Sequence, residues 1–81
     1  MDAKIKEGKL KELLDFEFEE SKNTYFREIK YPVLLVVDKK TRYMVVKTPF
    51  GEAAFMEAHK DKFQDLIDAD MVEFVKGEFD R

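Results

Sequence analysis

The sequence contains no cysteine and no tryptophan, and its 81 residues include only three glycines, two prolines and one histidine. Without cysteine the chain has neither a disulfide framework nor a thiolate metal site, a composition compatible with a reducing compartment. The N-terminal residues MDAKIKEGKL lack the apolar core of a secretory signal, and no stretch approaches the roughly 18 apolar residues that a membrane-spanning helix needs. We therefore expect a cytoplasmic protein with no membrane partner.

Catalytic and metal-binding patterns are also missing. The only histidine, His59, has no cysteine to activate, and Ser21 does not stand in a G-x-S-x-G turn. Asp68, Asp70 and Glu73 offer three carboxylates close together, but their segment has no glycine-bearing ligand loop, and a helix end with a capping aspartate is the simpler interpretation. We therefore expect no enzyme activity, no cofactor and no bound metal.

The chain is rich in both apolar and charged residues, at 44% and 41% of the sequence. Disordered chains carry far fewer aliphatic and aromatic groups, so this composition indicates a folded protein with a strongly charged surface. Its length suits one small domain, residues 1–81, whose core alone supplies only a few kcal/mol of stability. The net charge of -3 opposes a general nucleic-acid-coating role, because phosphate binding draws on clustered basic residues.

The strongest structural signal is the central stretch YPVLLVVDKKTRYMVVKT. Residues 33–37 form a continuous apolar, β-branched run, which predicts a central strand buried on both faces. Asp38 then begins a short turn over residues 38–41, where its carboxylate can accept hydrogen bonds from the following backbone N–H groups. Residues 42–48 return as the second strand of a hairpin, and neither of its faces is cleanly polar.

The N-terminal third shows two different periods. In residues 4–14 the apolar positions fit one face of an amphipathic helix. Residues 15–20 alternate as in a strand, although a continued helix is the alternative because Leu10, Leu14 and Phe18 also fit an i, i+4 row. The polar residues 21–24 predict a turn that closes a first hairpin onto a strand at residues 25–30.

The C-terminal part is predicted to contain a second helix and a final strand. Pro49, Phe50 and Gly51 end the central hairpin, and residues 52–69 follow a helical period. Residues 71–79 alternate again, as expected for an edge strand. The order α-β-β-β-β-α-β predicts an α+β domain with one antiparallel sheet of three to five strands and two helices. Because the sheet is apolar on both faces, we expect another chain to cover part of it, most simply in a homodimer.

The second predicted helix presents a candidate protein-binding surface. Its polar face carries a mostly acidic row, formed by Glu57, Asp61, Asp65 and Asp68. Like charges at i, i+4 cost a few tenths of a kcal/mol each, and a solvated helix face is the usual explanation for such a row. As a binding site, the row suits the basic surface of another protein.

The tip of the central hairpin is the most basic point of the chain. Lys39, Lys40 and Arg42 gather there beside Tyr43, in a pattern that can bind single-stranded nucleic acid. Stacking of a base on such a ring contributes roughly 1 to 3 kcal/mol. The glycine-aromatic core of RNA-recognition strands is absent, and charged hairpin tips ordinarily serve solubility.

Together these patterns predict a non-enzymatic protein-interaction domain. Small size, high charge and many aromatic residues without a coherent catalytic set fit a binding protein better than an enzyme. The expected role is that of a small acidic inhibitor or adaptor that uses its acidic helix or an open sheet edge. The alternative is a domain that binds single-stranded nucleic acid through the basic hairpin tip.

Overall fold

The two apolar runs at the centre of the chain form the central hairpin of the sheet. The computed structural model describes residues 1–53 and 56–76, and in it β4 (Val33–Asp38) pairs antiparallel with β5 (Tyr43–Thr48). Asp38 Oδ1 accepts hydrogen bonds from the backbone N–H groups of Lys40 and Thr41, at 2.7 and 2.9 Å. The predicted hairpin and its aspartate-headed turn are therefore confirmed.

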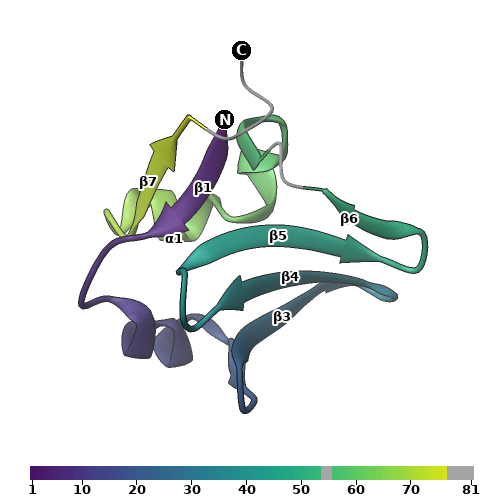
Figure 1. Ribbon diagram of the computed structural model, residues 1–81, viewed down its shortest axis with the longest axis horizontal. Helices are drawn as coiled ribbons and strands as arrows, with labels where there is room; N and C mark the ends of the chain where they lie inside the picture. The colour runs from purple at the N-terminus through teal and green to yellow at the C-terminus, as the bar shows by residue number, and fades with distance from the viewer. Residues whose placement is uncertain (54–55, 77–81) are drawn as a thin grey trace.

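Within the described residues, the sheet around this hairpin contains seven strands. Six of them follow the order β2-β3-β4-β5-β1-β7, and β6 also pairs with β5 (Figure 1). The remaining strands are β1 (Asp2–Ile5), β2 (Glu19–Glu20), β3 (Thr24–Lys30), β6 (Gly51–Ala53) and β7 (Val72–Val75). All pairings are antiparallel. The predicted α+β class and single antiparallel sheet are confirmed, whereas the predicted three to five strands are too few.

The helix predicted at residues 4–14 is confirmed only in part, because a strand ends at Ile5 and helical turns begin only at Leu10. Its first part belongs to β1, where Ala3 and Ile5 point into the core with the two-residue alternation of a strand. The chain then bends at Gly8, whose φ of 82° favours glycine, and enters the 3₁₀ helix η1 (Leu10–Phe16). η1 also takes up part of residues 15–20, for which a strand was predicted, and only Glu19–Glu20 pair as a strand.

The long helix predicted for residues 52–69 is also confirmed only in part, because its helical turns are shorter and interrupted, and residues 54–55 lie outside the described residues. Its beginning is strand β6, and its later part is a 3₁₀ helix, η2 (Met56–Lys62), followed by the short α-helix α1 (Gln64–Asp68). The break falls at Phe63, whose φ and ψ of -141° and 32° are not helical. Phe63 is completely buried, and the centre of its ring lies 6.2 Å from that of Phe74. We attribute the break in the helix to this packing of Phe63 in the core.

The final strand is confirmed in part. β7 covers Val72–Val75 and is the last strand in the sheet order, as predicted for an edge strand. It pairs with β1, placing Ile5 opposite Val72, so segments from the two ends of the described chain lie side by side (Figure 1). The rest of the predicted strand, from residue 77 onward, lies outside the described residues.

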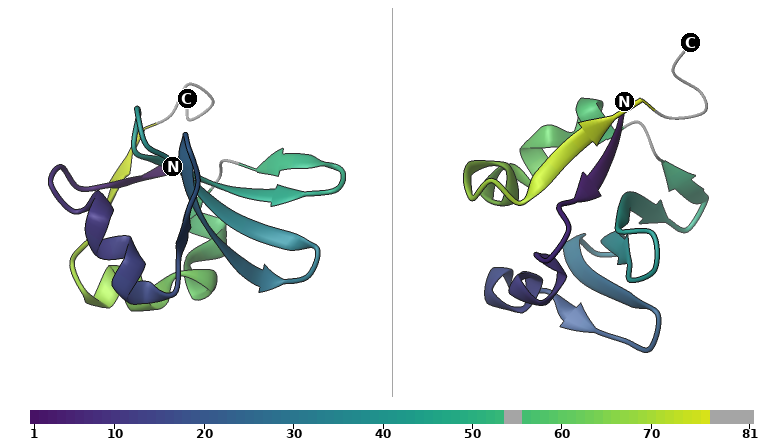
Figure 2. Two further views of the ribbon diagram at one scale, coloured as in Figure 1. Left: turned by 90° about the horizontal axis from the view of Figure 1, so that it is seen from below. Right: turned by 60° about the vertical axis from the view of Figure 1, so that its left-hand side comes forward.

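The core lies between one face of the sheet and the helical segments. Its buried side chains are Ala3, Ile5, Leu13, Phe18, Tyr25, Leu35, Val37, Met44, Val46, Phe63, Leu66 and Met71. Strands β3, β4 and β5 contribute to it only through alternate residues, as strand geometry requires. The β3–β4 and β5–β6 hairpins extend away from the helices, as both views in Figure 2 show.

Candidate protein-interaction surface

Strands β3, β4 and β5 also carry apolar side chains on the face turned away from the core. Among the residues that alternate with the buried ones, four are apolar and half-buried: Phe26, Leu34, Val36 and Val45. Because successive strand residues point to opposite sides, these four side chains share one face of the sheet. We call these residues, with Glu28 and Lys47, the outer face.

The strand register arranges the outer face in rows. Phe26 lies opposite Val36, which lies opposite Val45, so the first row is entirely apolar. In the second row Leu34 has Glu28 on one side and Lys47 on the other. A depression of about 240 Å³, open to solvent, is lined by Thr24, Phe26, Leu34, Val36 and Lys47.

The outer face is separate from the hydrophobic core. The half-buried apolar residues that pack against the core are Leu10, Phe16, Ile29, Val33, Ile67, Val72 and Phe74. None of the four apolar outer-face residues belongs to this group, within the part of the chain that the structure describes. Contiguous apolar surface of this kind is typical of binding sites.

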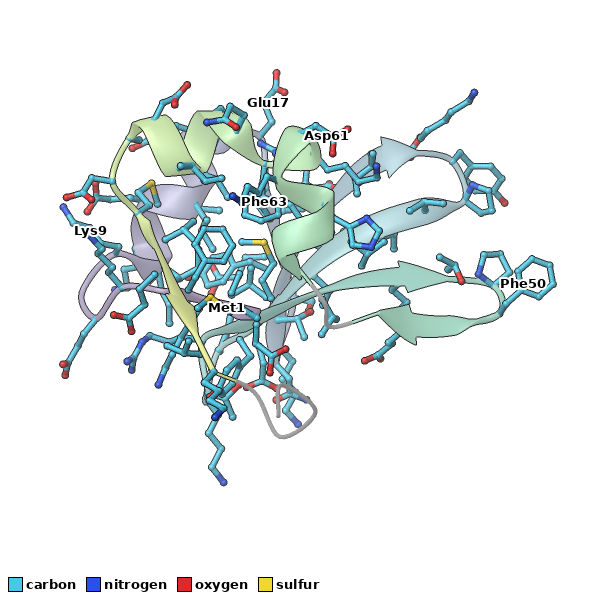
Figure 3. The ribbon with its side chains drawn as sticks, turned by 90° about the horizontal axis from the view of Figure 1, so that it is seen from above. Met1, Lys9, Glu17, Phe50, Asp61 and Phe63 are labelled. Carbon is cyan, nitrogen blue, oxygen red and sulfur yellow. The ribbon has the colours of Figure 1, made fainter. Side chains whose placement is uncertain are left out.

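Two strongly exposed aromatic residues lie in the turns at the far end of the hairpins. Tyr31, in the β3–β4 turn, is 81% exposed, and Phe50, in the β5–β6 turn, is 99% exposed. Lys47 pairs with Leu34 in the second outer-face row, and the next residue, Thr48, pairs with Gly51 beside the β5–β6 turn. Both turns therefore lie at the end of the sheet nearest to the second row. Figure 3 shows Phe50 at the hairpin end, far from Phe63 in the core. Aromatic side chains are enriched in interface cores.

The predicted acidic row does not form a single helix face, because the break at Phe63 separates Asp61 from Asp65. Asp61 is exposed and points outward in Figure 3. Asp68 is exposed and accepts a hydrogen bond from Gln64 Nε2 at 3.0 Å. Glu57 belongs to η2, and its side chain lies outside the described part of the structure.

Asp65 has a partner within the chain. Its carboxylate accepts hydrogen bonds from both terminal nitrogens of Arg27, at 2.8 and 3.2 Å. Arg27, only 14% exposed, also donates to the backbone carbonyls of Phe16 and Lys62 and lies over the ring of Phe18. The hydrogen bonds from Arg27 lower the pKa of Asp65. Asp65 therefore holds α1 against β3 rather than presenting a free charge.

The residues of the basic hairpin tip also have intrachain contacts. Lys39 forms an ion pair with Glu20 and lies over the Tyr25 ring, and Arg42 Nε donates to the Ile5 carbonyl at 3.0 Å. Tyr43 is 38% exposed and has Lys4 Nζ 5.3 Å from its ring centre. The exposed Lys40 side chain has no ion-pair partner among residues 1–53 and 56–76.

Asp38 adds a negative charge to the same tip. Hydrogen bonds from the backbone N–H groups of Thr41 and Lys40 lower the pKa of its carboxyl group, so it is ionised at neutral pH. The tip is therefore a partly neutralised turn, in which the positive charges of Lys39, Lys40 and Arg42 lie close to the negative charge of Asp38.

Neither a metal site nor a membrane span is found in the described parts of the chain. No three His, Cys, Asp or Glu side chains among them gather closely enough to hold a metal ion. Asp70, one of the carboxylates considered above, forms an ion pair with Lys6 at 2.6 Å, which lowers its pKa. No helix within residues 1–53 and 56–76 is long and apolar enough to cross a membrane.

Comparisons of this chain with protein-family models, with curated proteins and with solved structures find no match. The assignment of a site therefore depends on geometry. Sequence reasoning identified a hairpin with two apolar faces but not the residues of the outer face. The reason is that all residues of the run VLLVV are apolar, so the alternation between core and outer face is invisible in the sequence.

Proposed function

We propose that this protein is a non-enzymatic interaction domain that binds another protein through its outer face. The observation that carries the proposal is the contiguous set Phe26, Leu34, Val36 and Val45, which lies outside the core cluster of the described chain. Burial of apolar surface drives most protein association, at about 25 cal/mol per Å² removed from water. The exposed rings of Tyr31 and Phe50 supply the aromatic groups that often contribute most to binding.

An inhibitor or adaptor role is consistent with this surface. Such proteins act by occupying a surface of their target and need no catalytic group. The exposed carboxylates of Asp61 and Asp68 supply a second, charged region that can favour a basic partner. Nucleic-acid binding has weaker support, because Lys39 and Arg42 already make intrachain contacts.

Affinity capture with quantitative mass spectrometry tests the proposal. Val36 lies at the centre of the first outer-face row, so Val36→Asp should remove the partners that the unaltered protein captures, because a carboxylate cannot be buried there without a large cost. Val36→Thr, which retains strand propensity, should reduce capture less. Circular dichroism and thermal unfolding verify that each variant is folded.

The matched control is Leu14→Asp. Leu14 is a 48% exposed leucine on η1, a segment that packs on the core side of the sheet through the neighbouring Leu13. Its replacement introduces the same carboxylate away from the outer face, and capture should be retained. If folded Val36→Asp protein captures the same partners as the unaltered chain, the outer face is not the binding site. Loss of capture in Asp61→Lys or Asp68→Lys alone would assign binding to the acidic residues instead.

A further inference from the structure

Two charged residues of the outer face stand on either side of its apolar centre. Glu28 on β3 and Lys47 on β5 stand on opposite sides of Leu34, two strand spacings or about 10 Å apart at the backbone. Both side chains are exposed, and neither has an ion-pair partner among the described residues. The second row therefore carries a negative charge at one side, an apolar centre and a positive charge at the other side.

We propose that a second copy of this chain covers the outer face, related to the first by a twofold axis parallel to β4. This inference rests on the proposed function and names the partner. Rotation about such an axis places β3 of one copy over β5 of the other. Glu28 then faces Lys47 of the second copy, and the symmetry generates the same pair twice. Leu34 meets Leu34, Val36 meets Val36, and Phe26 meets Val45.

Two outer faces can also pack face to face about a twofold axis that runs across the strands, and the positions of the charges distinguish the two arrangements. A twofold axis across the strands would place β3 over β3 and β5 over β5, which brings like charges to the same side of the interface. Like charges facing each other in an interface oppose association. A twofold interface uses the same patch on both copies, so a surface must complement itself, as the row Glu28-Leu34-Lys47 does about β4.

The size of the outer face sets the expected strength of the dimer. Three strands about 4.8 Å apart, each about six residues long at roughly 3.3 Å per residue, cover about 300 Å². Stable interfaces bury about 800 Å² per partner, so the dimer should be transient even with added contacts from Tyr31 and Phe50. We expect a dissociation constant between about 10 µM and 1 mM.

Charge reversal tests the pairing. In sedimentation experiments from about 10 µM to 1 mM, the unaltered chain should form a reversible dimer. Glu28→Lys and Lys47→Glu should each weaken it about tenfold, because each change replaces two attractive pairs by two repulsive ones. An equimolar mixture of the two variants should recover association, since both cross-pairs then join opposite charges. The double variant should recover it as well.

The controls are Glu7→Lys and Lys11→Glu, which make the same charge changes at exposed positions outside the outer face and should leave association unchanged. If Glu28 and Lys47 acted only within a single chain, mixing the Glu28→Lys and Lys47→Glu variants would not restore association. The inference is overturned if the unaltered chain is a monomer at 1 mM, or if the mixture associates no better than either variant. A monomer whose Val36→Asp variant still loses a captured partner would defeat this inference but leave the proposed function standing.

Discussion

At the scale of single residues, backbone strain is concentrated at three non-glycine positions of the described chain with positive φ: Glu17, Arg42 and Asp70. Two of them have side-chain bonds that offset the unfavourable conformation. Arg42 donates to the Ile5 carbonyl, and Asp70 pairs with Lys6. Glu17 is exposed, ends η1 with a φ of 66°, and has no side-chain bond among the described residues.

Replacement of Glu17 by glycine should therefore stabilise the protein. Glycine adopts the left-handed conformation at the end of a helix without strain from a Cβ atom. We expect Glu17→Gly to raise the free energy of unfolding by about 0.5 kcal/mol, after the greater entropy of glycine in the unfolded chain is subtracted. Urea denaturation measures the change.

Glu17→Ala is the control for this prediction. It removes the glutamate side chain but keeps the Cβ atom, so the strain should remain and the stability should not rise. An equal gain from alanine would attribute the effect to loss of the charge rather than to the backbone.

At the scale of elements, Arg27 joins three segments that the sequence places far apart. From β3 it contacts the carbonyl of Phe16 at the end of η1, the carbonyl of Lys62 at the end of η2, and the carboxylate of Asp65 in α1. A hydrogen bond to an ionised partner contributes more than one between neutral groups. The Arg27–Asp65 pair thus holds the helical segments against the sheet.

Asp65→Asn should reduce the free energy of unfolding by about 1 kcal/mol at pH 7, a modest value because the Asp65 side chain is 47% exposed. In the unfolded chain the pKa of an aspartate is about 4. In the folded state the hydrogen bonds from Arg27 lower the pKa of Asp65 below that value. The ionised carboxylate therefore stabilises the fold above that pH, and this contribution is lost as the pH falls through the folded pKa. Urea denaturation at several pH values measures the difference.

The difference between Asp65→Asn and the unaltered chain should be constant above about pH 5 and shrink in more acidic solution. Asp61→Asn serves as the control, because that exposed carboxylate should change stability by less than about 0.5 kcal/mol. A difference that does not depend on pH would show that Asp65 acts by packing and not by charge.

At the scale of the whole molecule, β1 is central to the fold, because it joins β5 to the last described strand, β7. Ile5 is completely buried at this junction, whereas Leu14, assigned by sequence to the same helical stripe, is largely exposed. The two side chains are similar in size, and the sequence pattern assigns them to one helix face. In the structure one of them is buried and the other is largely exposed, so we expect their contributions to the free energy of unfolding to differ.

Ile5→Ala should cost about 2 to 4 kcal/mol, and Leu14→Ala less than about 1 kcal/mol. A domain of this length has a total stability of about 4 to 12 kcal/mol, so the first change should remove a large share of it. Thermal or urea unfolding of the two variants measures the contrast. Equal costs would support a continuous helix over residues 4–14 and contradict β1.

Much of the fold was predictable from local pattern. The hairpin of β4 and β5, the Asp38 turn and the edge strand β7 follow from short runs, turn chemistry and alternation, which act between neighbours in the sequence. The two predicted helices were correct only in part, and the reason is nonlocal. Their apolar residues fit a helical period, but Ile5 and Phe63 are positioned by contacts with β7, to which residues Val72 and Phe74 belong.

The candidate site was predictable only in outline. The acidic residues and the basic tip were visible as sequence patterns, but the roles of Asp65, Lys39 and Arg42 in intrachain contacts depend on partners between 19 and 38 residues away. Charge patterns in a sequence do not show which charges the fold has already paired.

By itself, the sequence determined an α+β protein with an apolar central hairpin and a charged surface, because these follow from composition and local periodicity. Only the tertiary structure decided which face of that hairpin would be covered. Leu34 and Leu35 are adjacent and chemically identical, yet one lies in the core and the other on the outer face. Strand geometry separates the two side chains, and the packing of the core against one side of the sheet determines which remains available for a partner.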